Sequence, residues 1–401
     1  MKTRVLIAAM LSIASAAQAG EFIPVTVAQF STGQWFFDGK QSALGGNVSA
    51  QFVPAYKFSD KFAILPTVES NYRGTRSAEE LAGGATLFQD TWENALGVKA
   101  VMSPTENWTY RARVSGRSKW YRETSDEKWT HGLYDYQSAS GGGEAERKWG
   151  KVSLAAGYDF THLHFPNYQS LESSQTGDQA RELAGTDVLD SDIHMLSLRG
   201  HSPLPARFNI DVAGYIAPRM YSDQHVVVLS GLFADTKRVD TTSGVNVSLN
   251  RAFRGPLSSM MAVSFLYGYL GMQSNQNHYD ARLTTFVPDF YDYDQQTTGV
   301  QLQAAFGHTY AGPMSADLAT TYAHRNYRSR PIQDTDGSYL SEKLDTTETA
   351  VSAGFGYPLT RNIKARISTT IGRSRSNNKF EQLYRYNYSN ANYQFGFVYE
   401  Y

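Results

Sequence analysis

Residues 108–120 read Trp-Thr-Tyr-Arg-Ala-Arg-Val-Ser-Gly-Arg-Ser-Lys-Trp, and this stretch decides the fold class. In an extended strand, one face carries Trp, Tyr, Ala, Val, Gly, Ser and Trp, whereas the other carries Thr, Arg, Arg, Ser, Arg and Lys. The strand between Trp108 and Trp120 is ~40 Å long, and a tilt of ~40° reduces that length to a height of ~30 Å. This height fits the two aromatic girdles that flank a hydrocarbon layer. The stretch therefore predicts a transmembrane β-strand with Trp108 and Trp120 in the girdles.

The same period of two recurs along the chain. Residues 208–216, 300–306 and 363–371 each alternate apolar side chains with polar or small ones. A helical arrangement would place lysine and arginine on the apolar face of residues 363–371, so it is excluded. A soluble β-sandwich is also disfavoured, because its strands average ~5–6 residues and the alternation here is longer.

Turn signals separate the strands, and short turns alternate with longer polar connections. The short turns fall near residues 59–60, 103–107, 150–151, 202–206, 251–256, 311–313 and 360–362. The longer connections fall near residues 38–46, 74–86, 123–132, 166–190, 222–237, 275–290, 329–344 and 377–385. This plan predicts about 16 strands, short periplasmic turns, longer extracellular loops and both termini in the periplasm. We expect an all-β fold, a single closed antiparallel transmembrane β-barrel over residues 20–401.

Residues 1–19 have the pattern of a cleaved secretory signal peptide. Lys2 and Arg4 precede an apolar run from Val5 to Ala14, and Ala17-Gln18-Ala19 gives the small-x-small pattern of a cleavage site. The apolar run is too short to cross a hydrocarbon core of ~30 Å as a helix. We therefore expect export, with cleavage after Ala19.

The composition excludes several functional classes. The chain has 401 residues, no cysteine and a formal net charge of −1. Without cysteine there is neither a disulfide framework nor a thiolate metal site. A near-neutral chain is also not a polycationic nucleic-acid binder.

The last residues, 394–401, carry the most specific motif: Gln-Phe-Gly-Phe-Val-Tyr-Glu-Tyr. They match the pattern polar-x-Gly-x-x-aromatic-x-aromatic at Gln394, Gly396, Tyr399 and Tyr401. Here the chain resembles the Gram-negative outer-membrane β-barrel proteins with a porin-like plan, although Tyr401 replaces the usual final Phe. The resemblance covers the signal peptide, the strand plan and the last strand. It implies the bacterial outer membrane, contact with its lipid and lipopolysaccharide, and the outer-membrane barrel assembly machinery as the partner that reads the motif.

A barrel of sixteen strands encloses a lumen too wide to be filled by wall side chains alone. The inward residues would include basic ones, namely Arg111, Arg113, Arg117, Lys119, Arg325, Lys364 and Arg366. The acids expected opposite them are Glu69, Glu93, Asp211, Asp240, Asp317 and Glu348. Such a basic ladder would attract anionic or dipolar solutes. The alternative, to which we give more weight, is that the ladder only solvates a wet wall and pairs with neighbouring acids.

Aromatic residues also cluster at Phe286, Phe290, Tyr291 and Tyr293. Such rings could stack sugars at a channel mouth. We favour a place in the outer aromatic girdle.

No catalytic constellation is found in the sequence. HExxH, P-loop and GxSxG motifs are absent. His162 and His164 share a strand face without a serine nucleophile two residues away, and the adjacent His201 and Ser202 would point to opposite faces. The sequence thus predicts no enzymatic activity, no cofactor and no metal site.

The predicted function is an outer-membrane channel that passes small hydrophilic solutes by diffusion, with a weak preference for anionic or dipolar solutes. One alternative is the barrel component of a polysaccharide or protein export or assembly system with periplasmic partners. Another is a structural or adhesive barrel. A homo-oligomer is compatible with each of these.

Overall fold

The computed structural model describes residues 21–74, 90–122, 126–168, 187–256, 259–280, 285–381 and 385–401. The expected signal peptide, residues 1–19, lies outside the described residues. No helix in the described part of the chain is long and apolar enough to cross a membrane.

The strands are β1 (Glu21–Ile23), β2 (Thr26–Phe37), β3 (Lys40–Phe52), β4 (Ala55–Ser59), β5 (Phe62–Arg73), β6 (Asp90–Thr105), β7 (Trp108–Arg122), β8 (Tyr136–Trp149), β9 (Val152–His164), β10 (Ser191–Leu204), β11 (Phe208–Val227), β12 (Phe233–Arg254), β13 (Met260–Ser274), β14 (His278–Asp280), β15 (Thr285–Val287), β16 (Tyr293–Thr309), β17 (Gly312–Gln333), β18 (Tyr339–Pro358), β19 (Ile363–Ser376) and β20 (Tyr388–Glu400). A short 3-10 turn, η2 (Pro205–Arg207), joins β10 to β11.

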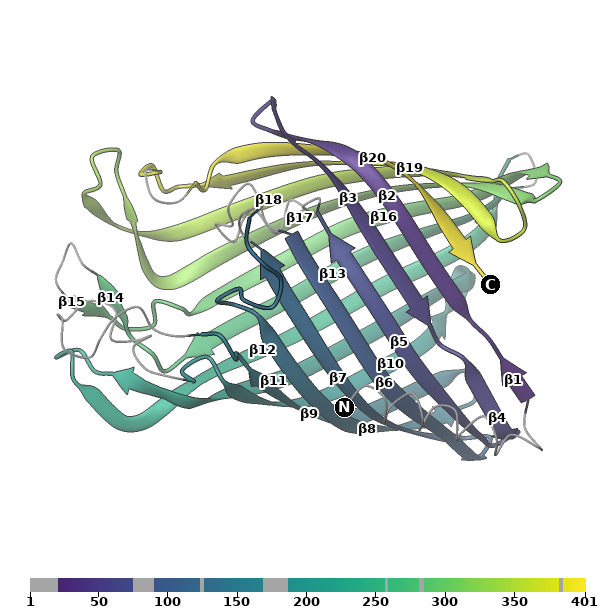
Figure 1. Ribbon diagram of the computed structural model, residues 1–401, viewed down its shortest axis with the longest axis horizontal. Coiled ribbons are helices and arrows are strands. Elements are labelled where there is room, and N and C mark those ends of the chain that lie inside the picture. Colours follow the sequence, from purple (N-terminus) through teal and green to yellow (C-terminus); the bar gives the residue numbers. More distant parts are fainter. Residues whose placement is uncertain are drawn as a thin grey trace.

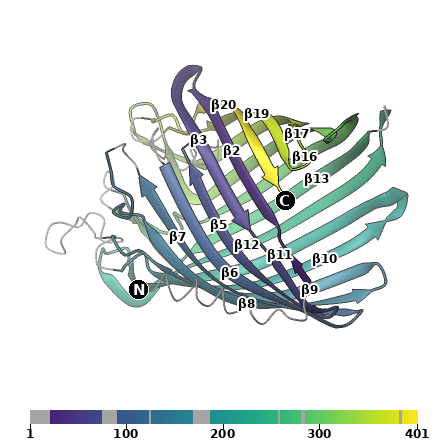
Figure 2. The ribbon, with the colours of Figure 1, turned by 45° about the vertical axis from the view of Figure 1, so that its right-hand side comes forward.

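The wall is a closed antiparallel barrel of 16 strands, which confirms the predicted fold class (Figure 1). Neighbouring wall strands pair in chain order, and β20 pairs with β2 from Val27↔Glu400 to Phe37↔Asn390. This last pairing closes the ring, and Figure 2 shows the end of β20 beside β2. Strands β1 and β4 pair with each other and continue the β2–β3 hairpin beyond Pro24 and Pro54.

Alternation along the strands separates an apolar outer face from a polar inner face. Val114, Leu196 and Ile367 lie on the outer face and remain 62%, 59% and 58% exposed. Because exposed apolar surface costs about 25 cal/mol per Å² in water, an outer wall of this kind is suited to hydrocarbon. Among the described residues, the buried apolar cluster consists of Trp35 and Tyr388, with Phe37 packed against it.

The expected long connection at residues 38–46 is instead a two-residue turn. Asp38 and Gly39 have φ angles of 47° and 74°, as in a type I′ hairpin turn, so β3 begins directly at Lys40. The Asp-Gly pair is the usual sequence signal for this turn, but the polar and glycine-rich residues after it suggested a loop.

Two further expected loops, 222–237 and 329–344, are largely strand. β11 continues to Val227, where the backbone N–H donates to Gln276 Oε1 at 2.9 Å, and β12 begins at Phe233. β17 likewise continues to Gln333 and so includes Arg330, which lies within the expected loop. These strands extend because neighbouring segments pair with them, which the local sequence does not reveal.

The tall hairpin β17–β18 makes the barrel rim uneven. These strands have 22 and 20 residues, whereas β2 and β5 have 12 each. At ~3.3 Å per residue and ~40° of tilt, the difference raises this part of the wall by roughly 25 Å. The extra height lies at the long-loop end, since each strand begins or ends at a short turn at the other end.

Two glycines allow β2 and β20, whose pairing forms the seam of the barrel, to approach each other. A Cβ atom at Gly396 would lie 2.7 Å from Ser31 Cα, and one at Gly33 would lie 3.0 Å from Gln394 Cα. The partner atoms belong to the backbone, so they cannot move aside without changing the strand spacing. Gly396 therefore has a packing role that does not depend on recognition of the terminal motif.

Gly396→Ala is expected to destabilise the closed barrel by about 1–3 kcal/mol, because the added methyl group overpacks the seam. Purified protein refolded into detergent micelles, without assembly factors, should show a smaller fraction of heat-modifiable barrel and a lower Tm. Gly141→Ala is the matched control, because its Cβ would meet nothing closer than 3.9 Å. Equal Tm values for the two variants would contradict the view that the spacing of β2 and β20 requires glycine at position 396.

Candidate functional site: the charged lumen wall

The structure places the predicted basic residues of β7 on the inner face. Arg111, Arg113, Arg117 and Lys119 alternate with the outward Tyr110, Ala112, Val114, Gly116 and Ser118. Arg113 lies opposite Lys99 of β6 and Gly142 of β8 in the register. The ladder therefore forms a column on one side of the lumen.

Carboxylates from nearby strands of the same side neutralise most of this column. Arg111 donates to Glu144 and Glu146, with N–O distances of 2.6 Å each. Arg113 Nε donates to Asp159 Oδ1 at 2.7 Å, and a second contact joins the same two side chains. The sequence had placed acids on the opposite wall, whereas the structure pairs these arginines with acids of β8 and β9.

Two more pairs complete this network. Arg199 of β10 contacts the buried Glu144, and Arg117 Nε lies 3.3 Å from Glu93 Oε1 of β6. Lys119 instead lies over the Tyr121 ring, with its Nζ 5.0 Å from the ring centroid. We call the inward residues Lys99, Arg111, Arg113, Arg117, Arg199, Glu93, Glu144, Glu146 and Asp159 the charged wall.

Two ion pairs of the inner face cross an intervening strand at a glycine. Gly142 separates Arg113 from Asp159 in the register, and a Cβ there would collide with Asp159. Asp317 likewise lies opposite Gly354, and Arg366, opposite Gly356 two residues further along the same strand, reaches diagonally across it, with its Nη2 atom 2.9 Å from Asp317 Oδ1. A Cβ at Gly354 would lie 2.5 Å from Asp317 Oδ1 and 2.9 Å from Arg366 Nη2. The missing side chain leaves room for the arginine to reach two strands away.

The remaining predicted residues lie apart from the charged wall. Arg325 donates to Gln295 Oε1 at 2.8 Å, and Lys364 pairs with Glu400 at 2.8 Å near the chain terminus. Glu69 accepts a hydrogen bond from Gln51 at 2.5 Å. The structure thus does not bring all of the predicted lumen residues into one ladder.

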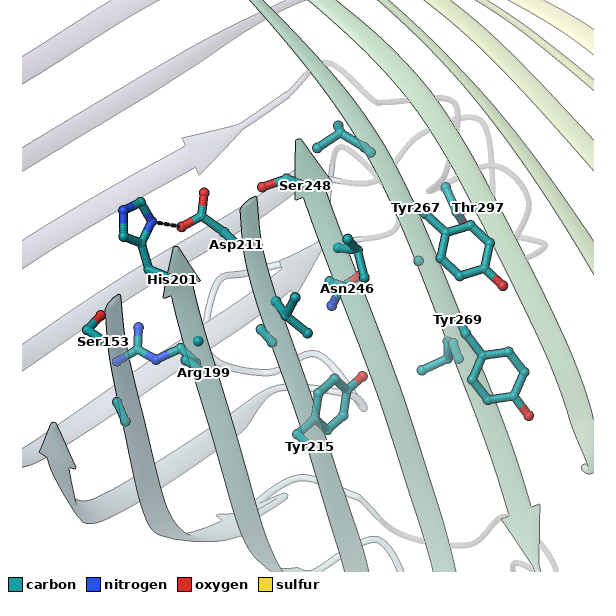
Figure 3. Close-up of a pocket in the computed structure, with 18 of the residues that line it drawn as sticks. Ser153, Arg199, His201, Asp211, Tyr215, Asn246, Ser248, Tyr267, Tyr269 and Thr297 are labelled. Atoms are coloured by element: carbon teal, nitrogen blue, oxygen red, sulfur yellow. Dashed lines mark hydrogen bonds and ion pairs between the residues drawn. The ribbon is translucent and has the colours of Figure 1, made fainter. Parts of the chain in front are cut away.

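Asp211 sits in a separate hydrogen-bonded group. Its Oδ1 lies 2.7 Å from His201 Nδ1, and its Oδ2 accepts from Asn250 Nδ2 at 2.9 Å. Figure 3 shows His201 and Asp211 joined on neighbouring strands. Both carboxylate oxygens therefore have a partner.

The charged wall borders a cavity of about 970 Å³ in the lumen. Uncharged side chains of β12 and β16 line another part of it, and we call them the amide wall: Asn246, Ser248, Gln295 and Thr297. Leu266 and Leu270 of β13 lie between these two strands on the same face. Figure 3 shows Asn246 and Ser248 on one strand, with Arg199 and Tyr215 on the strands before it. A solute here would meet cations on one side and neutral donors and acceptors on the other.

The sequence analysis missed Lys99, Arg199, Glu144, Glu146 and Asp159. Period-two alternation alone could have placed them inward, since their strand faces carry mostly small or polar residues. Their partners could not be read, because an ion pair across strands depends on the register between segments far apart in the chain.

The structure places the aromatic residues in two settings. Trp120 contacts Trp92 edge-on at 5.3 Å, and Trp108 stacks on Tyr110 at 5.8 Å near the other end of β7. The second cluster packs against arginines instead: Arg325 lies 4.6 Å from the Tyr293 ring, and Arg330 lies 4.9 Å from the Phe290 ring. These arginine contacts occupy faces of the rings that would otherwise be open to a sugar.

One group of metal-ligand types occurs among the described residues, at the long-loop ends of β9 and β10. His164, Asp187 and Asp190 place one ligand atom each within 4.8 Å of one another. Asp190 is already bound by His164 Nδ1 at 2.6 Å and by the Phe165 N–H at 2.8 Å. These bonds tie the end of the connection between the strands to β9.

A second buried aspartate fixes the connection between β7 and β8. Asp135 accepts from the N–H groups of Tyr121 and Gly132, at 2.7 and 3.1 Å. Burial raises the pKa of the Asp135 carboxyl, although these two hydrogen bonds partly oppose the shift.

Comparison with known proteins supports the fold. No protein-family model matches the chain, and no curated protein sequence matches it either. OccAB1 of Acinetobacter baumannii is similar in structure, with a TM-score of 0.50, 11% identity, and coverage of 96% of this chain and 99% of that one. OccD3 of Pseudomonas aeruginosa has a TM-score of 0.45 and 8% identity over 94% of this chain and 91% of that one. In vitro folded OmpT, an outer membrane protein of Vibrio cholerae, has a TM-score of 0.43 and 12% identity over 96% and 98%.

The chain thus shares the fold of outer-membrane β-barrels. At these identities, the likeness concerns the fold alone.

Gly354→Ala tests whether the Arg366–Asp317 ion pair needs a glycine on the strand that it crosses. It should destabilise the barrel by about 1 kcal/mol, because the methyl group displaces the Arg366–Asp317 pair. In an Asp317→Ala background the same substitution should cost much less, since the atom nearest the new Cβ is gone. Urea unfolding of the four proteins in the cycle measures the coupling. Additive effects would contradict this role of Gly354.

Proposed function

We propose that this protein is an outer-membrane channel through which small hydrophilic solutes diffuse. The observation that carries the proposal is a closed wall with an apolar outer face and an inner face of charged and amide side chains. Charged and hydrogen-bonding side chains predominate on this inner wall, so a hydrated passage is its simplest use. The signal peptide predicted at residues 1–19 and the terminal motif, Gln394 to Tyr401, suit delivery to the outer membrane.

Selectivity follows from the pairing of the charged wall. Arg111, Arg113, Arg117 and Arg199 all contact carboxylates, so their fields largely cancel at a distance. Lys99 makes no ion pair within the described chain, so one ammonium group beside the cavity is not directly neutralised. We therefore expect a weak preference for anions rather than strong selectivity.

Purified mature protein in planar bilayers should give discrete conductance steps with a small anion preference under a KCl gradient. Arg113→Gln should shift the permeability ratio toward cations by about two- to fourfold, the effect of a unit charge at roughly 5–10 Å in water. Asp159→Asn should shift it toward anions by a similar factor. The double variant should return close to the wild-type ratio, because both members of one pair are then neutral.

A folded, heat-modifiable protein that never conducts would refute the channel. If the protein conducts but neither single variant changes the permeability ratio, the channel proposal stands and the role of the Arg113–Asp159 pair is refuted. Gel mobility before and after heating gives the folded fraction in each preparation.

N-terminal sequencing of the protein recovered from outer membranes should begin at Gly20. The small residues Ala17 and Ala19 set this position. Ala19→Leu should block processing and leave a longer precursor. An intact Met1 in the membrane-inserted wild-type protein would contradict the signal peptide.

A further inference from the structure

Two arginines face outward near the long-loop end of β19. Arg373 and Arg375 follow Ile367 and Ile371 at even intervals along a regular strand, so all four side chains lie on the outer face of the barrel. Both arginines are exposed, and in the described chain neither guanidinium makes an ion pair or lies over an aromatic ring. Two positive charges therefore face the membrane without a partner from the described part of the protein.

This pair differs from other outward charges of the barrel. Other outward arginines contact an aspartate or an aromatic ring: Arg122 with Asp90, Arg328 with Asp294, Arg147 with Trp149, and Arg251 with Phe208. An exposed guanidinium on this face is thus commonly satisfied by a neighbouring strand. On β19 the neighbouring strands supply no such group within the described residues.

Acids near the two arginines are already held by other cations. Asp345 of β18 lies on the same outer face, and its Oδ2 is 3.3 Å from His324 Nε2. Asp38, in the turn between β2 and β3, has its Oδ2 2.7 Å from Arg385 Nη2. Lys343, on the same side of β18, adds a third cation without an ion pair among the described residues. The described chain thus leaves the counter-ion to another molecule.

The position along β19 places the arginines at the outer boundary of the hydrocarbon. Ile363, at the short-turn end of the strand, lies opposite Tyr399 in the register. The stretch from Ile363 to Arg373 spans ~33 Å, which a tilt of ~40° reduces to a height of ~25 Å. This height equals the apolar band of a transmembrane barrel. Arg373 therefore lies where the headgroups of the outer leaflet begin.

An apolar surface lies directly below the arginines. Ile367 and Ile371 are 58% and 51% exposed, and Val351, opposite Ile371, is 47% exposed. Hydrocarbon chains cover such a surface favourably. A ligand with anionic groups at one end and acyl chains at the other would match both the cations and this surface.

From this arrangement we propose that Arg373 and Arg375 bind the phosphate groups of an outer-leaflet glycolipid, whose acyl chains lie along Ile367, Ile371 and Val351. Arginine suits this ligand, because its planar guanidinium donates two parallel N–H bonds to a phosphate. Lipopolysaccharide carries phosphates and acyl chains on one sugar core, so it has the required chemistry. The site lies on the outside of the barrel, so it gives the protein a defined lipid partner whether or not the lumen conducts.

Three probes separate the two parts of the ligand: diphosphoryl lipid A, the same lipid without its phosphates, and inorganic pyrophosphate. In native mass spectrometry of the refolded mature protein in detergent, diphosphoryl lipid A should bind about tenfold more tightly than either of the others. Arg373→Gln and Arg375→Gln should each raise its Kd about tenfold, the value of one hydrogen bond to a charged group.

Arg361→Gln is the matched control, because it removes the same charge from an exposed turn at the other end of β19. A Kd that this control changes as much as Arg373→Gln would overturn the proposal. Equal binding of the lipid with and without phosphates would also overturn it, and so would pyrophosphate that binds as tightly as the lipid. Conductance in bilayers of phosphatidylcholine, which contain no lipopolysaccharide, tests the channel separately.

Discussion

The pairing of β2 with β20 is the contact on which the rest of the structure depends. Without it, two strand edges would present backbone N–H and C=O groups to hydrocarbon, at several kcal/mol for each unpaired group. Gly33 and Gly396 keep the two backbones at pairing distance, because neither has a side chain to separate them. On the inner side, Phe37 stacks on Tyr388 at 5.5 Å and adds apolar contact across the same seam. The other described wall strands each pair with the wall strands next to them in the chain, so this closure joins the two ends of the sheet.

The inner wall meets a different constraint. Many charged residues line one side of the lumen, and a wall of like charges would repel itself. Pairing each arginine with an acid on a nearby strand removes that repulsion and holds long side chains against the wall. What remains for a solute is the local pattern: an ammonium group at Lys99 without an ion pair in the described chain, and uncharged side chains on β12, β13 and β16.

The sequence predicted the parts of this design that depend on the alternation within one strand. The barrel, the strand around Val114 and the inward position of Arg111 and Arg113 all follow from a period of two. It did not predict the strand extension at Val227, which is stabilised by a side chain from a distant connection. Nor did it predict that Asp159 is the partner of Arg113, because that depends on how three strands are shifted against one another. The turn at Asp38 was missed for another reason, since its two-residue signal was read as the start of a loop.

The ion pairs that cross a strand have a consequence for how such a wall can change over evolutionary time. Arg113, Gly142 and Asp159 come from three adjacent strands and lie opposite one another, so a change at one of them alters the surroundings of the other two. A larger residue at the central position excludes the pair, and a lost charge leaves its partner uncompensated. Related sequences should therefore vary at these positions as triplets, with the arginine, the glycine and the aspartate gained or lost together. The same holds for Asp317, Gly354 and Arg366, so linked changes among homologous chains would trace which strands lie two apart in the wall.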